Sequence, residues 1–316
     1  MKTNNYLLVK ALFALFFYSL FGIIWDVYAN DAQDWNQFHG PKRDRISSES
    51  NWLSNWDENP PKQLWRQTIG IGFSSISVVG NRVYTMGNQD DKDTVWCFDA
   101  NTGQEIWRHT YSCELFPKMH EGGPGGTPTV DADAVFTVSK DGQMFCLNAF
   151  NGEVNWSKNL QKEFGAEMPT WRFALSPLLE NDMVILDIGL AVALHKKTGE
   201  VIWKSHNYES AYSSPIAFDF QEKRYIAIFP KFGLVLLDAE NGKEFGKYKW
   251  DTRYGCNAAT PIFHENKFFV SSGYGRGGSV IALNDNGELK EVWYNRLMRN
   301  HMNSCVLWNG FLYGFD

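Results

Sequence analysis

One short phrase recurs five times along this chain, and its spacing limits the folds that the chain can adopt. Each copy has an apolar run, a polar turn that ends in glycine, and a second short run that usually ends in tryptophan. The repeated glycines are Gly103, Gly152, Gly199, Gly242 and Gly287. They are 49, 47, 43 and 45 residues apart. That period is typical of propeller blades rather than of helical or leucine-rich repeats.

The phrase predicts a β-hairpin with a tight turn. An Asp or Asn such as Asp99 can bond the backbone two residues on, and the glycine can adopt the left-handed conformation that such turns need. Tryptophan stands four residues after the glycine in three copies, where a large flat side chain could fit between neighbouring blades. These residues are Trp107, Trp156 and Trp203. Gly246 takes this position in the fourth copy, and Trp293 is displaced by two residues in the fifth.

A second element lies roughly thirty residues before each glycine and consists of Ser or Thr, usually followed by proline. Its copies are Ser75-Ile76-Ser77, Thr127-Pro128, Ser176-Pro177, Ser214-Pro215, Thr260-Pro261 and Ser304-Cys305. An alternating strand follows each one, such as Arg82–Met86. One repeat therefore encodes four antiparallel strands, and the predicted fold is an all-β propeller of four-stranded blades. A β-sandwich is the alternative, but it gives no reason for the same Gly and Trp at a fixed period.

The motif Asp-x-x-Thr-Gly-Gln-x-x-Trp at 99–107, with its variant at 195–203, resembles the pyrroloquinoline-quinone (PQQ) repeat family. The resemblance runs from about Pro61 to the end. The resemblance implies membership of a family that contains eight-bladed quinoprotein dehydrogenases and non-enzymatic relatives. One of these relatives is a lipoprotein that helps to assemble outer-membrane β-barrels. Residues 34–41 and 70–75 also resemble a bacterial subgroup of secreted propellers. The repeated residues build blades and carry no chemistry, so they predict the fold and leave the function open.

The organisation expected from these patterns has three parts. Residues 1–29 read as a secretory signal peptide with cleavage after Ala29, residues 30–60 as an N-terminal extension, and residues 61–316 as the propeller. About five and a half blades are present, whereas the family closes its ring with eight, or with seven as the alternative, so we expect a fragment of a longer chain. The expected location is periplasmic or secreted.

Composition excludes several classes of site and partner. Without residues 1–29 the net charge is about −7, which argues against nucleic acid as a partner. No membrane span is expected after signal cleavage. Five cysteines lie at unrelated spacings without a Cys-x-x-Cys motif, so no haem or zinc site is indicated. Cys97 and Cys146 occupy equivalent strand positions and are expected to be small buried residues.

Candidate binding residues lie in the loops that lead into the inner strands, because propellers bind ligands where such loops converge. These loops are rich in Arg, His, Asn and aromatic residues. The candidates for a polar pocket are Glu121, Trp171, Arg172, Arg253, Asn257, Arg299 and His301. The alternative is that each one is an ordinary solvated or loop-fixing residue.

The functional hypothesis is a non-catalytic binding or scaffolding module, whose partner is a protein or a small polar ligand at the propeller face. One alternative is a quinoprotein dehydrogenase of alcohols or sugars, which would need PQQ and a calcium ion held by Glu and Asn oxygens. No such ligand set, catalytic residue or metal site can be assigned from motifs, so no cofactor is expected outside that alternative. A third possibility is an assembly factor for envelope proteins.

Overall fold

The structure is a computed structural model that describes residues 34–51 and 53–316. The expected signal peptide, residues 1–29, lies outside this part of the chain. Asp34–Ser47 and Leu53–Asp316 form one compact unit, which contains all the strands described below. Residues 48–51 belong to a second unit and form no helix or strand.

The compact unit contains five sheets of four antiparallel strands and a sixth of two, each formed by consecutive segments of the chain. Blade 1 comprises β1 (Ser77–Val79), β2 (Arg82–Gln89), β3 (Lys92–Asp99) and β4 (Glu105–Ser112). Blade 2 comprises β5 (Thr129–Asp131), β6 (Ala134–Val138), β7 (Gln143–Asn148) and β8 (Val154–Asn159). Blade 3 comprises β9 (Leu178–Glu180), β10 (Met183–Asp187), β11 (Ala191–His195) and β12 (Val201–Lys204).

The later blades repeat this order. Blade 4 comprises β13 (Ile216–Phe220), β14 (Lys223–Ile228), β15 (Gly233–Asp238) and β16 (Glu244–Lys249). Blade 5 comprises β17 (Ile262–His264), β18 (Lys267–Ser272), β19 (Gly277–Leu283) and β20 (Leu289–Asn295). The sixth sheet pairs β21 (Val306–Trp308) with β22 (Phe311–Tyr313). A short helix, α2 (Leu160–Phe164), and one 3-10 turn, η1 (Arg253–Gly255), interrupt the strands.

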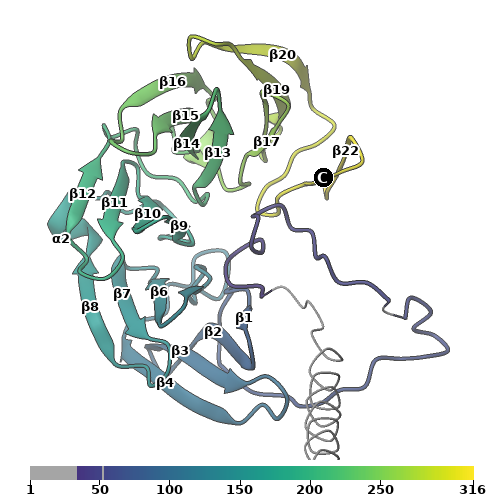
Figure 1. Ribbon diagram of the computed structural model, residues 1–316, viewed down its shortest axis with the longest axis vertical. Coiled ribbons are helices and arrows are strands. Elements are labelled where there is room, and N and C mark those ends of the chain that lie inside the picture. The colour runs from purple at the N-terminus through teal and green to yellow at the C-terminus, as the bar shows by residue number, and fades with distance from the viewer. Residues whose placement is uncertain (1–33, 52) are drawn as a thin grey trace, which may run out of the picture. The chain divides into compact units, whose positions relative to one another are not determined.

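The sheets follow one another around a common centre, with the first strand of each blade innermost (Figure 1). Inner strands of successive blades are in contact: β1 with β5, β5 with β9, and β9 with β13. The predicted propeller of four-stranded antiparallel blades is confirmed.

The recurring Ser and Thr residues link the inner strands. At four of the five steps along the series, the backbone N–H donates to the hydroxyl of the equivalent residue in the next blade, as for Thr127 N to Ser176 Oγ at 2.9 Å and Ser176 N to Ser214 Oγ at 2.8 Å. Ser75 to Thr127 and Thr260 to Ser304 repeat this bond. The hydroxyl of Thr260 is buried without a partner among the described residues, which marks the one break in the series. The second sequence element is therefore an interblade hydrogen-bond device.

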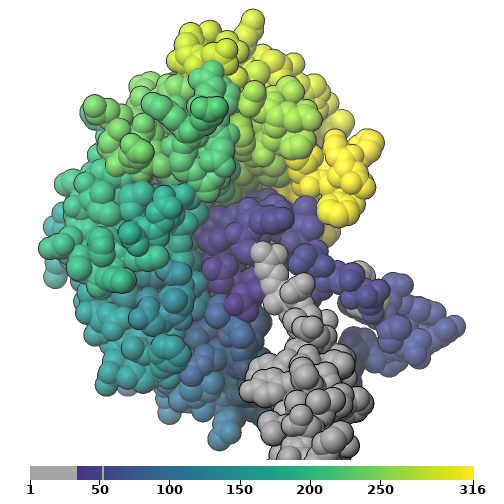
Figure 2. Space-filling model, in the orientation of Figure 1, coloured from purple at the N-terminus to yellow at the C-terminus, as the bar shows by residue number. Residues whose placement is uncertain are grey.

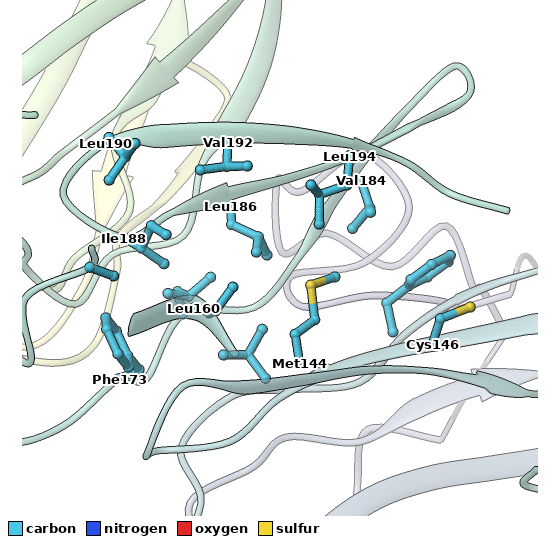
Figure 3. Close-up of a cluster of buried hydrophobic side chains, with 14 residues drawn as sticks. Met144, Cys146, Leu160, Phe173, Val184, Leu186, Ile188, Leu190, Val192 and Leu194 are labelled. Carbon is cyan, nitrogen blue, oxygen red and sulfur yellow. The ribbon is translucent and has the colours of Figure 1, made fainter. Parts of the chain in front are cut away.

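Apolar side chains of neighbouring sheets interdigitate to form the core between blades. Between blades 2 and 3, Met144 and Cys146 of β7 face Leu186 of β10 and Val192 of β11, and Leu160 of α2 closes one side (Figure 3). Cys97 and Cys146 are buried, as predicted, and all five cysteines are free thiols.

The three expected tryptophans pack between blades. Trp107 and Trp203 are each 6% exposed, and Trp156 is half-buried. Each indole covers the turn glycine of the following blade and donates its N–H to a carbonyl there; Trp107 Nε1 bonds Ala149 O at 2.9 Å. Trp65 does the same for blade 1, bonding Ala100 O at 2.8 Å, although its segment forms no strand.

The interface between blades 4 and 5 is built differently, because Gly246 stands where the tryptophan would be. A Cβ atom at Gly246 would collide with the carbonyl oxygen of Gly287, so the backbones of β16 and the blade 5 turn touch directly. Trp250, four residues later, is fully buried and donates Nε1–H to Ser272 Oγ at 3.0 Å. The displaced Trp293 is 43% exposed.

Candidate functional site

A segment from Asp34 to Ile46, here called the axial segment, runs through the centre of the blades, which sequence analysis did not anticipate. In Figure 2 it occupies the middle of the compact unit, between blades 1–4 and the end of the chain. It begins with a pair of backbone contacts: Val78 N donates to Trp35 O, and Val130 N donates to Asn36 O, both at 2.8 Å. Blades 1 and 2 are thereby tied to its start.

Two arginines extend these contacts to the remaining blades. Arg43 donates Nη1–H to Pro215 O of blade 4 at 2.8 Å and Nη2–H to Pro177 O of blade 3. Arg45 donates Nη1–H to Cys305 O, beside the sixth sheet, at 2.7 Å and Nη2–H to Thr260 O, beside blade 5, at 3.5 Å. This short segment thus contacts the inner edge of every sheet.

The axial segment places two guanidinium groups, those of Arg43 and Arg45, in a largely buried position. Arg43 is 8% exposed, and its third partner is the neutral amide of Gln37, at 2.9 Å from Nε. Burial, with the charge of Arg45, lowers the pKa of Arg43 to about 9. Burial, with the same two guanidinium charges, lowers the pKa of His39 to about 2, so this imidazole is neutral. Both arginines remain charged at neutral pH.

The predicted loop residues lie at one end of the strands. Because the strands alternate in direction, the loops between blades and the turns between the second and third strands share this end, here called the entry face. The turns between the first and second strands lie at the opposite end, here called the turn face. All seven candidates from the sequence belong to the entry face.

The structure brings some of these candidates together and separates others. Trp171 and His301 join a row of rings described below, and Arg253 lies 4.9 Å from the ring of Tyr254. Arg172 turns away to Phe116, 4.1 Å from its ring, and to Asp141 at 3.6 Å. Arg299 pairs with Asp316, Nε to Oδ1 at 2.8 Å. Glu121 is exposed.

Asn257 has a structural position. It is fully buried, donates Nδ2–H to Pro230 O at 2.8 Å, and accepts bonds at Oδ1 from Ser272 and Thr252. Its backbone carbonyl also accepts from Tyr212 N and Ser213 N. Asn257 therefore fixes the loop that precedes blade 5 rather than facing a ligand.

Five aromatic side chains form a row across the entry face, here called the aromatic row: Trp171, Tyr212, Tyr254, Tyr274 and His301. Trp171 lies 5.8 Å from Tyr212 and 6.2 Å from Tyr254, centroid to centroid. Tyr254 is 5.2 Å from Tyr274, which is 4.6 Å from His301. The row thus joins the loops before blades 3, 4 and 5 to the loop before the sixth sheet.

Two members of the aromatic row are open to solvent. Tyr254 is 56% and Tyr274 42% exposed, whereas burial raises the pKa of the inner Tyr212 to about 12. Tyr254 and Tyr274 have φ angles of 66° and 53°, a left-handed backbone that bulky residues seldom adopt. Such conformations cost free energy and are concentrated at binding sites. Tyr212, Tyr254 and Tyr274 were not among the predicted site residues, although the first two lie in loops that the sequence singled out.

The side chains of the compact unit limit the kinds of binding site that it can form. Among the described residues, no three His, Cys, Asp or Glu side chains gather as a metal site would require. The same part of the chain contains no helix that is both long and apolar enough to cross a bilayer. Aromatic rings with adjacent arginines suit non-covalent recognition.

Comparisons with known proteins agree with this architecture. An outer membrane protein assembly factor BamB from Burkholderia pseudomallei (strain K96243) is 26% identical over 202 residues, covering 60% of this chain and 45% of that protein. The crystal structure of BamB from Moraxella catarrhalis matches 79% of this chain and 69% of its own, with a TM-score of 0.55 and 15% identity. A europium-containing methanol dehydrogenase matches 83% of this chain and 62% of its own, with a TM-score of 0.59 and 12% identity.

The two solved structures show the fold alone, since BamB and a methanol dehydrogenase share it. The chain spans about half the length of the curated relatives that it matches. One family model, PQQ_2, described as outer membrane protein assembly factor BamB, matches residues 24–112 and 91–316. The repeats seen in the sequence and the blades that they form thus identify the chain as a member of the PQQ_2 family of BamB-like propellers.

Proposed function

We propose that this chain is a non-catalytic docking propeller of the bacterial envelope, which binds a protein partner through its entry face during the assembly of outer membrane proteins. The observation that carries the proposal is the aromatic row, with Tyr254 and Tyr274 presented to solvent. The name of the curated relatives, outer membrane protein assembly factor, supports the process. A periplasmic location is part of the proposal.

The chemistry of the entry face favours a protein as the ligand. Tyr, Trp and Arg dominate the energetics of protein interfaces, because they provide large contact areas together with hydrogen-bonding groups. Here Arg253 lies over Tyr254, and the rings of Tyr254 and Tyr274 pack edge to face with their centroids 5.2 Å apart, which restrains both rings before a partner arrives. A surface arranged in advance loses less entropy on binding.

The quinoprotein alternative requires PQQ together with calcium, and the residues of the axis do not fit the calcium ion. Calcium needs several oxygen ligands, usually with carboxylates. The carbonyl oxygens of Pro177, Pro215 and Cys305 already accept hydrogen bonds from guanidinium groups, and two buried positive charges repel a cation. We therefore assign neither group to this chain. Incubation with PQQ and calcium, followed by dye-linked oxidation of alcohols and aldoses, tests this; turnover that a chelator abolishes would contradict it.

The docking function is tested by complementation. The full chain is produced in a bacterium that lacks its own BamB, and the amount of folded outer membrane protein is measured by heat-modifiable gel mobility. We expect the chain to restore folded protein and the double variant Tyr254→Ala, Tyr274→Ala to lose most of this effect, because the exposed half of the aromatic row is removed.

The matched control is Phe150→Ala, which removes an exposed ring from the turn face at the tip of the β7–β8 hairpin. It should behave as the wild type. Equal amounts of the three chains are verified by immunoblot. Failure of the wild-type chain to restore folded outer membrane protein, or full activity of the double variant, contradicts the proposal.

A further inference from the structure

A second concave site lies at the turn face, away from the aromatic row. It is a cavity of about 850 Å³ between the axial segment and blades 3 to 5 and the sixth sheet. Pockets for small ligands generally have volumes of about 300–1,000 Å³. Its wall from the axial segment carries Lys42, Arg43 and Arg45, and its wall from the blades carries Ile216, Phe218 and Phe263.

The charges around this cavity are unequal. Its acidic lining residues are Asp44, Glu180 and Asp219. Glu180 and Asp219 are both bound to Arg224, at 2.9 and 3.0 Å. Among the acidic lining residues, Asp44 is therefore the one left to balance the three cations of the axial segment, and it lies between Arg43 and Arg45. The net charge of the whole chain, by contrast, is −6.

The two arginines retain the capacity to bind an anion. A guanidinium group has five N–H donors, of which Arg43 uses three and Arg45 two, all in bonds to neutral oxygens. Arg45 Nε has no hydrogen-bond partner among the described residues. Buried charges are normally paired with an opposite charge. Among the described residues no carboxylate is hydrogen-bonded to either guanidinium, although burial lowers the pKa of Arg45 and the charge of Asp44 partly opposes this.

The opposite wall is apolar and aromatic. The ring centroids of Phe218 and Phe263 are 4.5 Å apart. Phe218 and Ile216 are buried in the interblade core, so Phe263, which is half-buried, is the ring that this wall offers to the cavity. An anion with an apolar body would therefore contact cations on one side and this ring on the other. A simple inorganic anion would leave the aromatic wall without a partner.

We propose that this cavity is a binding site for a small amphipathic anion, whose acidic group is bound by Lys42, Arg43 and Arg45 and whose apolar part packs on Phe263. The site is independent of the entry face and of protein docking. Arg43 and Arg45 have φ angles of 54° and 68°, in the same left-handed region as Tyr254 and Tyr274 of the aromatic row. Strained backbone thus presents the cationic side chains as well.

The probe for this site is 8-anilinonaphthalene-1-sulfonate, an aromatic anion whose fluorescence rises on binding. Titration of the full chain should give a saturable signal, weakened by added sodium chloride because salt screens charge attraction. Lys42→Gln should weaken binding about fivefold, because it removes one exposed charge and leaves the buried arginines in place. Arg45→Lys should bind more tightly than Arg45→Gln, because it keeps the charge. The matched control, Lys223→Gln, changes an exposed lysine of the turn face outside the cavity and should leave binding unchanged.

Competition experiments test separately whether the site requires the charge of the ligand and whether it requires the apolar part. Octanoate should displace the probe, whereas octanol, which lacks the charge, and sulfate, which lacks the apolar body, should displace it poorly at the same concentration. Thermal unfolding of each variant establishes that it is folded. Binding that is unchanged in Lys42→Gln, or displacement by octanol as effective as by octanoate, would overturn the proposal.

Discussion

The indole ring of Trp107 in blade 1 lies directly on Gly152 in the turn of blade 2. A Cβ atom at Gly152 would lie 2.6 Å from the ring, so the glycine and the tryptophan require each other. Trp156 covers Gly199 in the same way. The two most regular features of the sequence are therefore the two halves of one interblade contact.

Removal of this ring should destabilise the propeller. Trp107→Ala deletes a buried indole and its bond to Ala149, and large-to-small changes at such sites cost about 3–5 kcal/mol. Urea unfolding followed by circular dichroism measures the loss. The control is Trp308→Ala, at a side chain that is 51% exposed, which should change the free energy of unfolding by about 0.5 kcal/mol or less. Equal effects of the two substitutions would refute the docking role of Trp107.

The fourth repeat gives a prediction that opposes the repeat consensus. Gly246→Trp restores the residue found at this position in three other copies, yet it should destabilise the chain, because β16 already touches the carbonyl of Gly287. Overpacking of this kind costs about 1–3 kcal/mol or more. The urea midpoint of Gly246→Trp measures this. A midpoint at or above that of the wild type would show that the interface can open to admit the ring.

Arg43 should be essential for stability although it lies outside the repeats. Arg43→Met leaves the carbonyl of Pro215 and Oε1 of Gln37 without their donor, whereas Pro177 O keeps its bond from Thr129 Oγ1. Each buried unpaired group costs about 1–3 kcal/mol. We expect a loss of about 2–6 kcal/mol in urea unfolding, from these two groups together. Lys42→Met, at the neighbouring exposed side chain, should change the free energy of unfolding by about 0.5 kcal/mol or less. A neutral effect of Arg43→Met would mean that the axial segment contributes little to the fold.

Asp187 should make stability depend on pH. It is buried at the end of β10 and accepts bonds from Gly189 N and Phe229 N, both at 3.2 Å. Burial raises the pKa of Asp187 to about 7 from 3.8. The folded state therefore holds a proton that the unfolded chain releases above about pH 4. This contribution is complete below about pH 4 and is lost as the pH rises through about 7.

The free energy of unfolding should thus fall between about pH 5 and 7 by up to about 1.4 kcal/mol per pH unit from this group. Asp99, Glu163 and Glu244, whose pKa values are lowered, act in the opposite sense at lower pH. His39 and His109 also act in the opposite sense below about pH 6.5, because burial lowers their pKa values and there only the unfolded chain takes up their protons. In urea unfolding at several pH values, the slope of the free energy of unfolding against pH should be more positive for Asp187→Asn than for the wild type, because the variant lacks this negative contribution. The exposed control Asp285→Asn should keep the wild-type slope; an unchanged slope in Asp187→Asn would reject the assignment.

The sequence predicted the blades because each one repeats the same local physics. The alternating strands, the turn residues and the interblade tryptophans recur at a fixed period, and Thr127 and Ser176 mark the inner strands in the same way. Even the exception at Gly246 was visible as a departure from the repeat. These features can be recognised in the sequence without knowing which distant residues are in contact.

The axial segment and the aromatic row were harder to predict because neither belongs to a repeat. Arg43 and Arg45 bind backbone carbonyls, which every residue has, so no sequence signal identifies their partners. The available sign was the cluster of Lys42, Arg43 and Arg45 in an acidic chain. Among the loop candidates, Asn257 proved to be a buried loop anchor and Arg172 pairs with Asp141, because loop conformation decides where such side chains point.

The central claim, that the entry face docks a protein of the envelope, is tested most directly by site-specific photo-crosslinking in living cells. A benzophenone side chain is placed at position 254 of the aromatic row and, in a separate chain, at position 150 of the turn face. The account predicts that position 254 yields a discrete adduct with an envelope protein of the outer membrane assembly pathway and that position 150 does not. The same adducts from both positions, or none from position 254 in cells whose outer membrane proteins the chain restores, would contradict it.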